Sequence, residues 1–369
     1  MKRITNHLLV LVIALSMFSC SSENTPSTRR QMGGSIQVGP LMLAGNVSTF
    51  AGKFGFFVMS DGTGTAAYFE QPSNITTDGT NLYVTDQTAH VIRKIVISTR
   101  EVTTLAGTVD VDGSADGIGT GASFNRPAGI TTDGTDLYVA DSWNNTIRKI
   151  VISTGQVTTL AGTAGMAGSA DGIGADAMFN SPYGITTNGT NLYVCDSGNS
   201  TIRKIIIRTG QVSTLAGSAG IVGFTDGTGP AAHFGHPSDI TTDGSALFIA
   251  DQINHIIRKI DIVTSDVTTL AGSAGVSGSA DGIGSSASFN WPMGVTTDGT
   301  NLYIADTDNS TIRKIVIQTG AVSTVAGSPG SAGLIDGNSS TARFGSPTGI
   351  TSDGSRLYVV DFNTIREIR

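Results

Sequence analysis

Residues 127–162 read PAGITTDGTDLYVADSWNNTIRKIVISTGQVTTLAG, and this stretch decides the fold. Its first segment, residues 129–132, is a short β-forming run, and Asp133-Gly134 after it is a strong signal for a two-residue hairpin. Residues 137–140, 146–152 and 157–160 follow as three more short runs rich in β-branched residues, separated by turns. Because no helical period is present, the unit is predicted to be a four-stranded antiparallel sheet.

The unit recurs along the chain. Six prolines stand 55 residues apart, at Pro72, Pro127, Pro182, Pro237, Pro292 and Pro347. A fixed period of this length is typical of repeat architectures, in which each unit buries its apolar face against its neighbours. Four short strands per unit favour a propeller blade.

The two ends of the chain complement one another. The last unit stops at Arg369 after its third strand, whereas Val47–Gly52 matches the fourth strands but has no unit before it. Pairing these segments would close the ring and remove an open sheet edge. The predicted fold is therefore all-β, a six-bladed β-propeller with four antiparallel strands per blade, in which an N-terminal strand completes the last blade.

The repeated motif resembles that of the NHL family. In the second unit it consists of residues 137–141 (LYVAD), Asn144 and the pair Ile147-Arg148, and it recurs in later units. The first unit departs, with Ala89 in place of asparagine, and the last unit is two residues shorter after Asp361. The resemblance implies a six-bladed propeller. Since NHL domains serve binding, scaffolding and sometimes catalysis, it implies no single function.

Composition and the N-terminus indicate where the protein acts. A net charge of −7 provides no basic surface for nucleic acid. Lys2 and Arg3 precede a short apolar run over residues 8–17, which is too brief to span a bilayer, and the run ends at Ser19-Cys20. This pattern resembles a bacterial lipoprotein signal, with Cys20 as the lipidated residue. We expect a signal peptide over residues 1–19, a flexible tether over 20–45 and the propeller over 46–369, lipid-anchored in the bacterial cell envelope and facing the periplasm or the exterior.

The carboxylates that recur in nearly every blade are interpreted as structural. One set ends the second strands, as Asp141 does, and the other belongs to repeated Asp-Gly loops, as Asp116 does. Each is expected to accept backbone hydrogen bonds or to pair with the arginine of its own motif. Cys195 occupies a column of small or apolar residues and is predicted to be a buried thiol.

Catalytic and metal sites find weaker support. The chain has no Gly-x-Ser-x-Gly elbow, and its glycine clusters precede no helix, so nucleophilic catalysis and phosphate binding are disfavoured and no catalytic residue is assigned. No cofactor is expected. Calcium at residues 110–116 (DVDGSAD) and a divalent metal at His233, His236 and Asp239 are the alternatives.

Specificity is expected where the blades differ on one face. In propellers, the loops entering the innermost strands share a face with the loops that join the second and third strands. Residues beside the repeated prolines vary there, and we predict that they bind a ligand: Arg126, Tyr183, His236, Asp239, Trp291 and Met293. Trp143, in a loop between second and third strands, would extend this patch. Aromatic faces, a cation and hydrogen-bonding groups suit recognition of a polar partner.

Two functions of different classes follow. The first is a lipid-anchored envelope protein whose propeller binds or scaffolds a protein, peptide or glycan partner. The second is a metal-dependent lyase or lactonase at the mouth of the channel, a chemistry found in other six-bladed propellers.

Overall fold

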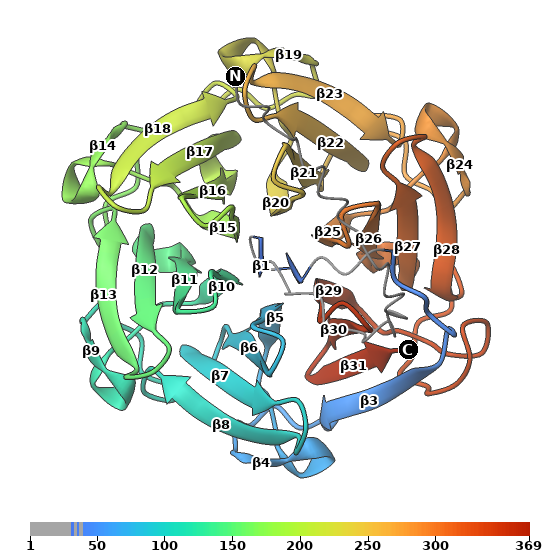
Figure 1. Cartoon of the computed structure of the whole chain (residues 1–369), viewed down its shortest axis with the longest axis horizontal. Helices are drawn as coiled ribbons and strands as arrows, with labels where there is room; N and C mark the ends of the chain where they lie inside the picture. The colour runs from blue at the N-terminus through green and yellow to red at the C-terminus, as the bar shows by residue number, and fades with distance from the viewer. Residues whose placement is uncertain (1–30, 33–34, 37–39) are drawn as a thin grey trace, which may run out of the picture.

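The structure is a computed structural model that describes residues 31–32, 35–36 and 40–369. Residues 40–369 form a closed ring of six blades around a central channel, as Figure 1 shows. This confirms the predicted six-bladed propeller. In blades 1 to 5, the first four strands from the axis outward run antiparallel and follow the order of the chain.

Each blade contributes one strand to each of four concentric positions. The innermost strands are β5 (Pro72–Thr77), β10 (Pro127–Thr132), β15 (Pro182–Thr187), β20 (Pro237–Thr242), β25 (Pro292–Thr297) and β29 (Pro347–Ser352). The second strands are β6 (Asn81–Asp86), β11 (Asp136–Asp141), β16 (Asn191–Asp196), β21 (Ala246–Asp251), β26 (Asn301–Asp306) and β30 (Leu357–Asp361). The third strands are β7 (Val91–Val96), β12 (Thr146–Val151), β17 (Thr201–Ile206), β22 (Ile256–Asp261), β27 (Thr311–Val316) and β31 (Thr364–Ile368).

The fourth strands complete the blades. They are β8 (Glu101–Ala106), β13 (Gln156–Ala161), β18 (Gln211–Ala216), β23 (Asp266–Ala271), β28 (Ala321–Gly327) and, in blade 6, β3 (Val47–Gly52). Strand β3 pairs with β31 in antiparallel register, with Val47 opposite Ile368 and Gly52 opposite Thr364. The amino-terminal strand therefore closes the ring, as the sequence predicts.

The repeated Asp-Gly loops add a feature that the sequence analysis treats only as loop. Five of them form a short fifth strand at the outer edge of a blade, followed by one turn of 3-10 helix. These strands are β4 (Gly62–Thr63), β9 (Gly117–Ile118), β14 (Gly172–Ile173), β19 (Gly227–Thr228) and β24 (Gly282–Ile283). The turns that follow are η1 (Gly64–Ala66), η2 (Gly119–Gly121), η4 (Gly174–Asp176), η6 (Gly229–Ala231) and η7 (Gly284–Ser286), and three loops after second strands hold η3 (Ser142–Asn144), η5 (Ser197–Asn199) and η8 (Thr307–Asn309).

The apolar core lies between the blades. One cluster joins Tyr138 and Ile147 of blade 2 to Ile185 and Leu192 of blade 3, and Phe179 lies fully buried among them. Burial of such a side chain contributes about 1.5–3 kcal/mol. The phenylalanines of the Asp-Gly loops thus fill the spaces between neighbouring blades.

A buried arginine ties each blade to its Asp-Gly loop. Arg148, with no exposed side-chain surface, donates to Asp141 at 2.8 Å and to Asp116 at 2.8 Å. Its guanidinium also lies 5.2 Å from the ring centre of Phe124. The same arrangement recurs at Arg93, Arg203, Arg258, Arg313 and Arg366. The aspartates of the Asp-Gly loops and those that end the second strands therefore form structural ion pairs with these arginines, as the sequence predicts.

The segment before β3 lies against the ring. The Leu41 backbone N–H donates to Asp298 at 2.9 Å, in the turn between β25 and β26. Strands β1 (Gln31–Met32) and β2 (Ser35–Ile36) pair with each other, and β2 lies beside β29. Residues 40–46 thus approach the ring from the side where first and second strands are joined, which we call the turn face.

Candidate functional site

The opposite side of the ring, called the loop face here, carries the loops that enter the innermost strands. In blade 2, the Trp143 N–H of the loop between second and third strands donates to the carbonyl of Asn125, just ahead of Pro127. In blade 4, the Gln252 N–H donates to His236 in the same way. These bonds show that both sets of loops share one face, as the sequence analysis assumes.

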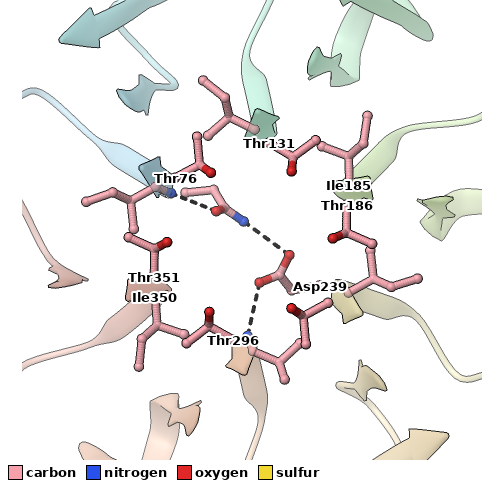
Figure 2. A pocket seen from close by; sticks show the side chains of 14 residues that line it. Thr76, Thr131, Ile185, Thr186, Asp239, Thr296, Ile350 and Thr351 are labelled. Carbon is pink, nitrogen blue, oxygen red and sulfur yellow. Dashed lines mark hydrogen bonds between the residues drawn. The ribbon is translucent and has the colours of Figure 1, made fainter. Parts of the chain in front are cut away.

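Two side chains close the channel below this face. The second residue after each repeated proline is glycine in four blades, but it is Asn74 in blade 1 and Asp239 in blade 4. The glycines are required by close packing, because a Cβ atom at Gly184 would lie 2.5 Å from the Cα atom of Asp239. Asn74 Nδ2 donates to Asp239 Oδ1 across the channel at 3.3 Å. Figure 2 shows the Asp239 carboxylate inside the ring of innermost strands.

The Asp239 carboxyl group has no positively charged partner among the described residues, but it accepts hydrogen bonds. The Val295 backbone N–H donates to its Oδ2 at 3.0 Å. Burial raises the pKa of Asp239 to about 7, although hydrogen bonds from Val295, Ile240 and Asn74 oppose this shift. The carboxyl group therefore changes charge near neutral pH.

Three of the predicted ligand-binding residues meet at the mouth of the channel. Tyr183, Asp239 and Met293 line a small cavity there together with Ser73, whose hydroxyl lies 3.3 Å from the Tyr183 hydroxyl. The cavity volume is only about 10 Å³, which is no larger than the space needed for one water molecule. These residues close the channel in this structure.

The other three predicted residues are spread around the loop face. Arg126 lies on blade 2, where its guanidinium stacks 4.2 Å from the ring centre of Trp143. Trp291 lies on blade 5, opposite blade 2, and is 38% exposed. His236 on blade 4 is half-buried, and burial lowers its pKa. The structure thus places Trp143 beside Arg126 and places Trp291 on the opposite side of the ring.

Two histidines have structural partners that the sequence does not reveal. The Arg126 backbone N–H donates to His90 Nδ1 at 3.1 Å, and the Trp291 N–H donates to His255 Nδ1 at 3.0 Å. Each histidine therefore links its own blade to the next. Since the acceptor nitrogen must be unprotonated, the lowered pKa of both histidines, which burial causes, favours this contact.

The residues considered for metal binding do not form a metal site. In the part of the chain that the structure describes, no group of three or more His, Cys, Asp and Glu side chains could hold a metal ion. Asp116, needed for calcium at residues 110–116, already accepts hydrogen bonds from Arg148 and Thr159. Neither the calcium alternative nor the site at His233, His236 and Asp239 fits this arrangement.

A cavity of the loop face lies off the axis, between blade 6 and blade 1. We call it the seam groove, since β3 closes the ring beside it. Its volume is about 500 Å³, within the range of ligand sites. The lining residues are Phe57, Glu70, Gln71, Pro72, Thr88, Ser346, Thr348, Phe362 and Asn363. Thr348 also lines the cavity at the channel mouth, so the groove begins there.

The seam groove lies where the repeat pattern is broken on both sides. On the blade 6 side, the unit that is two residues short presents Phe362 and Asn363. On the blade 1 side, the segment after β3 reads KFGFFVMS over residues 53–60, unlike the corresponding loops of the other blades. The Asn363 Nδ2 atom donates to the Phe56 carbonyl at 2.8 Å, which joins the two sides. Sequence departures in the first and last units are the signal that could have located this cavity.

Exposed apolar side chains surround the outer end of the groove. Phe57 is 68% exposed and Phe362 is 44% exposed. Phe54 packs beside Phe362 with ring centres 5.6 Å apart, and Phe56 packs beside Tyr68 at 5.3 Å. A cluster of exposed aromatic residues beside a cavity is typical of an interaction site.

Glu70 gives the inner wall of the groove a negative charge. The same position in the other blades holds asparagine or glycine. Partial burial raises the pKa of Glu70, and the neighbouring carboxylates of Asp110 and Asp86 raise it further. Arg93, the buried arginine of this blade, is paired with Asp61 and Asp86.

Cys20 lies outside the described residues, so its predicted lipidation stays a prediction. Within the described ranges, no helix has the length and apolar character needed to cross a membrane. Cys195 is fully buried, as the sequence predicts, and burial raises the pKa of its thiol.

Known proteins with a similar sequence contain the same kind of repeat. No protein-family model matches the chain. Human NHL repeat-containing protein 2 is 27% identical over 298 residues, which cover 71% of this chain and 41% of that protein. The Arabidopsis thaliana protein SUPPRESSOR OF QUENCHING 1, chloroplastic, is 30% identical over 275 residues, covering 70% and 26%. The chain is thus similar in sequence to an NHL repeat-containing protein and is a six-bladed β-propeller in fold, and it spans less than half the length of these relatives.

Solved structures share the fold at low identity. A Bacteroides thetaiotaomicron protein of unknown function is 23% identical with a TM-score of 0.67, covering 88% of this chain and 75% of that one. An auxiliary nutrient binding protein from the same organism is 17% identical with a TM-score of 0.64, covering 88% and 76%. A streptogramin B lyase is 14% identical with a TM-score of 0.52, covering 88% and 97%. At these identities the likeness concerns the fold alone.

Proposed function

We propose that this NHL-repeat propeller is a binding module that captures its partner on the loop face, centred on the seam groove. The observation that carries the proposal is the groove itself. It has a volume of about 500 Å³, and side chains that break the six-fold repeat line it. Since positions shared by all blades maintain the fold, the residues that differ at one cavity are the best candidates for specificity.

The closed channel supports binding outside the axis. Asn74 and Asp239 block the channel, and the mouth above them has room for one water molecule at most. Arg126 and Trp291 stand on opposite blades, so only a macromolecular partner would cover both together with the groove. We therefore propose a protein, peptide or glycan partner that occupies the groove and extends over Arg126, Trp143 or Trp291.

The proposed location is the bacterial cell envelope, with Cys20 as the lipid attachment site. The N-terminal charge and apolar run of the sequence support this proposal. Residues 40–46 approach the ring at the turn face. A tether leaving from that side would direct the loop face away from the membrane, which suits capture of a partner. Metabolic labelling with a palmitate analogue should mark the wild-type protein and leave Cys20→Ser unlabelled; label retained in Cys20→Ser contradicts the assignment.

The lyase or lactonase alternative receives less support. Such enzymes need a metal in the channel mouth, and the described residues provide no suitable group of ligands. A binding protein known from a solved structure with this fold shows that propellers of this shape serve capture, although its identity of 17% carries no ligand over to this chain.

The binding role of the groove is tested by placing tryptophan at a position where another blade naturally has it. Ser346 lines the groove, and the same position in blade 5 is Trp291. Ser346→Trp should fill the groove, whereas Ser181→Trp places the same bulk in blade 3, away from it. With envelope extract passed over each immobilised protein, wild type and Ser181→Trp should retain the same partner, and Ser346→Trp should lose it. Equal retention by all three proteins would refute the groove as the binding site.

The wider contact of the partner is tested separately. Replacing Arg126, Tyr183 and Trp291 together with alanine should weaken retention of a macromolecular partner while the fold persists. Circular dichroism serves as the control for folding. If retention is unchanged, the partner occupies the groove alone.

A further inference from the structure

We propose that the seam groove binds a basic-apolar peptide segment, with an apolar side chain against Phe57 and Phe362 and a neighbouring lysine or arginine at Glu70. This inference rests on the proposed function and names the chemistry of its ligand. Three independent features of the groove carry it: an ordered aromatic wall, a carboxylate with no cation among the described residues, and an acceptor oxygen with no donor among them.

The aromatic wall is held in place before any ligand binds. Phe54 packs against Phe362, and the Lys53 ammonium lies 4.9 Å from the ring centre of Phe56. The bond from Asn363 to the Phe56 carbonyl fixes the segment to blade 6. Phe57 remains 68% exposed beside these contacts. A preorganised apolar surface costs little ordering entropy on binding, so it suits an aromatic or aliphatic anchor.

The inner wall offers negative charge and acceptors. Glu70 lines the groove, and Asp110 from the loop after β8 is its neighbour. The cations of this region have other partners: Arg93 binds Asp61 and Asp86, and Lys53 lies over Phe56. Asn363 also lines the groove and is 1% exposed, yet its Oδ1 atom has no hydrogen-bond partner within the described residues. A ligand that donates hydrogen bonds and carries positive charge would complement this wall.

Other occupants fit less well. The chain's own residues 40–46 lie at the turn face, held through Leu41 by Asp298, on the other side of the ring. A glycan would favour aromatic rings with polar groups of their own, whereas the exposed rings here are phenylalanines. The combination of phenylalanine rings and a carboxylate favours a side chain pair such as phenylalanine beside lysine.

Fluorescence polarisation with short peptides tests the proposal. The probe is fluorescein-labelled Gly-Lys-Phe-Lys-Leu-Lys-Gly. One counterpart has glutamate for every lysine, and another has serine for phenylalanine and leucine. The protein is the chain from residue 21 onward. The basic-apolar probe should bind, and both counterparts should bind at least ~10-fold more weakly. Equal binding of the glutamate counterpart would overturn the proposal.

Substitutions that imitate other blades locate the contact. The position of Phe57 holds alanine in the loops before blades 3 and 6, at Ala167 and Ala332, so Phe57→Ala copies those loops. The position of Glu70 holds asparagine in blades 2, 3 and 5, so Glu70→Asn copies those blades. Each substitution should lower the affinity for the basic-apolar probe by ~10-fold. The effect of Glu70→Asn should become smaller at higher salt concentration, because salt screens the charge of Glu70. Val222→Ala, at the position equivalent to Phe57 before blade 4, is the matched control and should leave affinity unchanged. An unchanged affinity in Phe57→Ala or Glu70→Asn overturns the proposal.

A further pair of probes separates this inference from the proposed function. In one outcome the peptide does not bind, but maltohexaose or the apolar dye anilinonaphthalene sulfonate binds the wild type and no longer binds Ser346→Trp. The groove is then a binding site, and the proposed peptide chemistry is wrong. If Ser346→Trp changes the binding of none of these probes, and retains the same partner from extract, both proposals fail.

Discussion

Asn74 and Asp239 come from opposite blades and meet across the channel, with 3.3 Å between Asn74 Nδ2 and Asp239 Oδ1. Each replaces a glycine of the repeat, so the two departures compensate for one another in space. The pair fills the centre of a ring whose other four positions hold no side chain. A carboxyl group at this place experiences little water and no cation from the described residues, which gives it an unusual dependence on pH.

Asp239 should make the folded protein less stable as pH rises toward neutrality. Its folded-state pKa of about 7 exceeds the ordinary unfolded value of about 3.9. The folded state therefore holds the proton more tightly, and this contribution to stability is complete below about pH 4 and is lost as pH rises through about 7. Asp239→Asn has no such titration. The melting temperature of Asp239→Asn minus that of wild type should increase between pH 5 and pH 8.

Differential scanning calorimetry across this range provides the measurement. Other titrating groups are shared by both proteins, so they cancel in the difference. A difference in melting temperature that stays constant from pH 5 to pH 8 would show that Asp239 remains ionised throughout.

Arg148 should be far more important for stability than its neighbour Lys149. Arg148 is fully buried and holds Asp141 and Asp116, so Arg148→Met leaves the buried Asp141 without its cation. Removing one partner of a buried pair costs about 3–5 kcal/mol. Lys149 pairs with the largely buried Asp136, but 32% of the lysine side chain is exposed to solvent, so Lys149→Met should cost only about 1 kcal/mol. Urea unfolding, monitored by tyrosine and tryptophan fluorescence, compares the two variants. Similar unfolding midpoints for Arg148→Met and Lys149→Met would contradict the structural role of the arginine.

Cys195 should resist thiol reagents in the folded protein. The side chain is fully buried in blade 3, and burial raises the pKa of the thiol, so almost no reactive thiolate is available. In the chain from residue 21 onward it is the single cysteine. Ellman's reagent should react with less than one tenth of the thiol over an hour under native conditions and with one thiol per chain in guanidinium chloride. Rapid reaction of the native protein would mean that blade 3 opens readily.

The sequence predicts the architecture well because the repeat is so regular. The spacing of Pro72 and its counterparts sets the number of blades, and the match of Val47–Gly52 to fourth strands predicts ring closure. The buried pairing of Asp141 with Arg148 also follows from the motif. These features depend on contacts that recur in every blade, so one unit predicts the others.

The seam groove could not be predicted in the same way. It depends on how the segment around Phe57 and the shortened loop around Phe362 fold against each other, and neither has a counterpart in the repeat. Of the two, only the shortening of the last unit after Asp361 is visible from the repeated motif, and the motif gives it no spatial relation to the segment around Phe57. The sequence pattern also places Arg126 and Trp291 on one face, but opposite positions in the ring keep these residues apart.

Closure of the ring by β3 yields the last prediction. Phe50 and Ala51 of β3 are buried against the core of blades 6 and 1, and the Phe50 ring packs edge to face against Tyr358, with ring centres 5.1 Å apart. A chain that begins at residue 53 loses these contacts and exposes the edge of β31, whereas a chain that begins at residue 46 keeps them. Loss of one buried phenylalanine alone costs about 3–5 kcal/mol. The shorter chain should therefore melt well below the longer one and aggregate through its open edge. Equal melting temperatures and equal monomer fractions by size-exclusion chromatography would mean that the ring is stable without this strand.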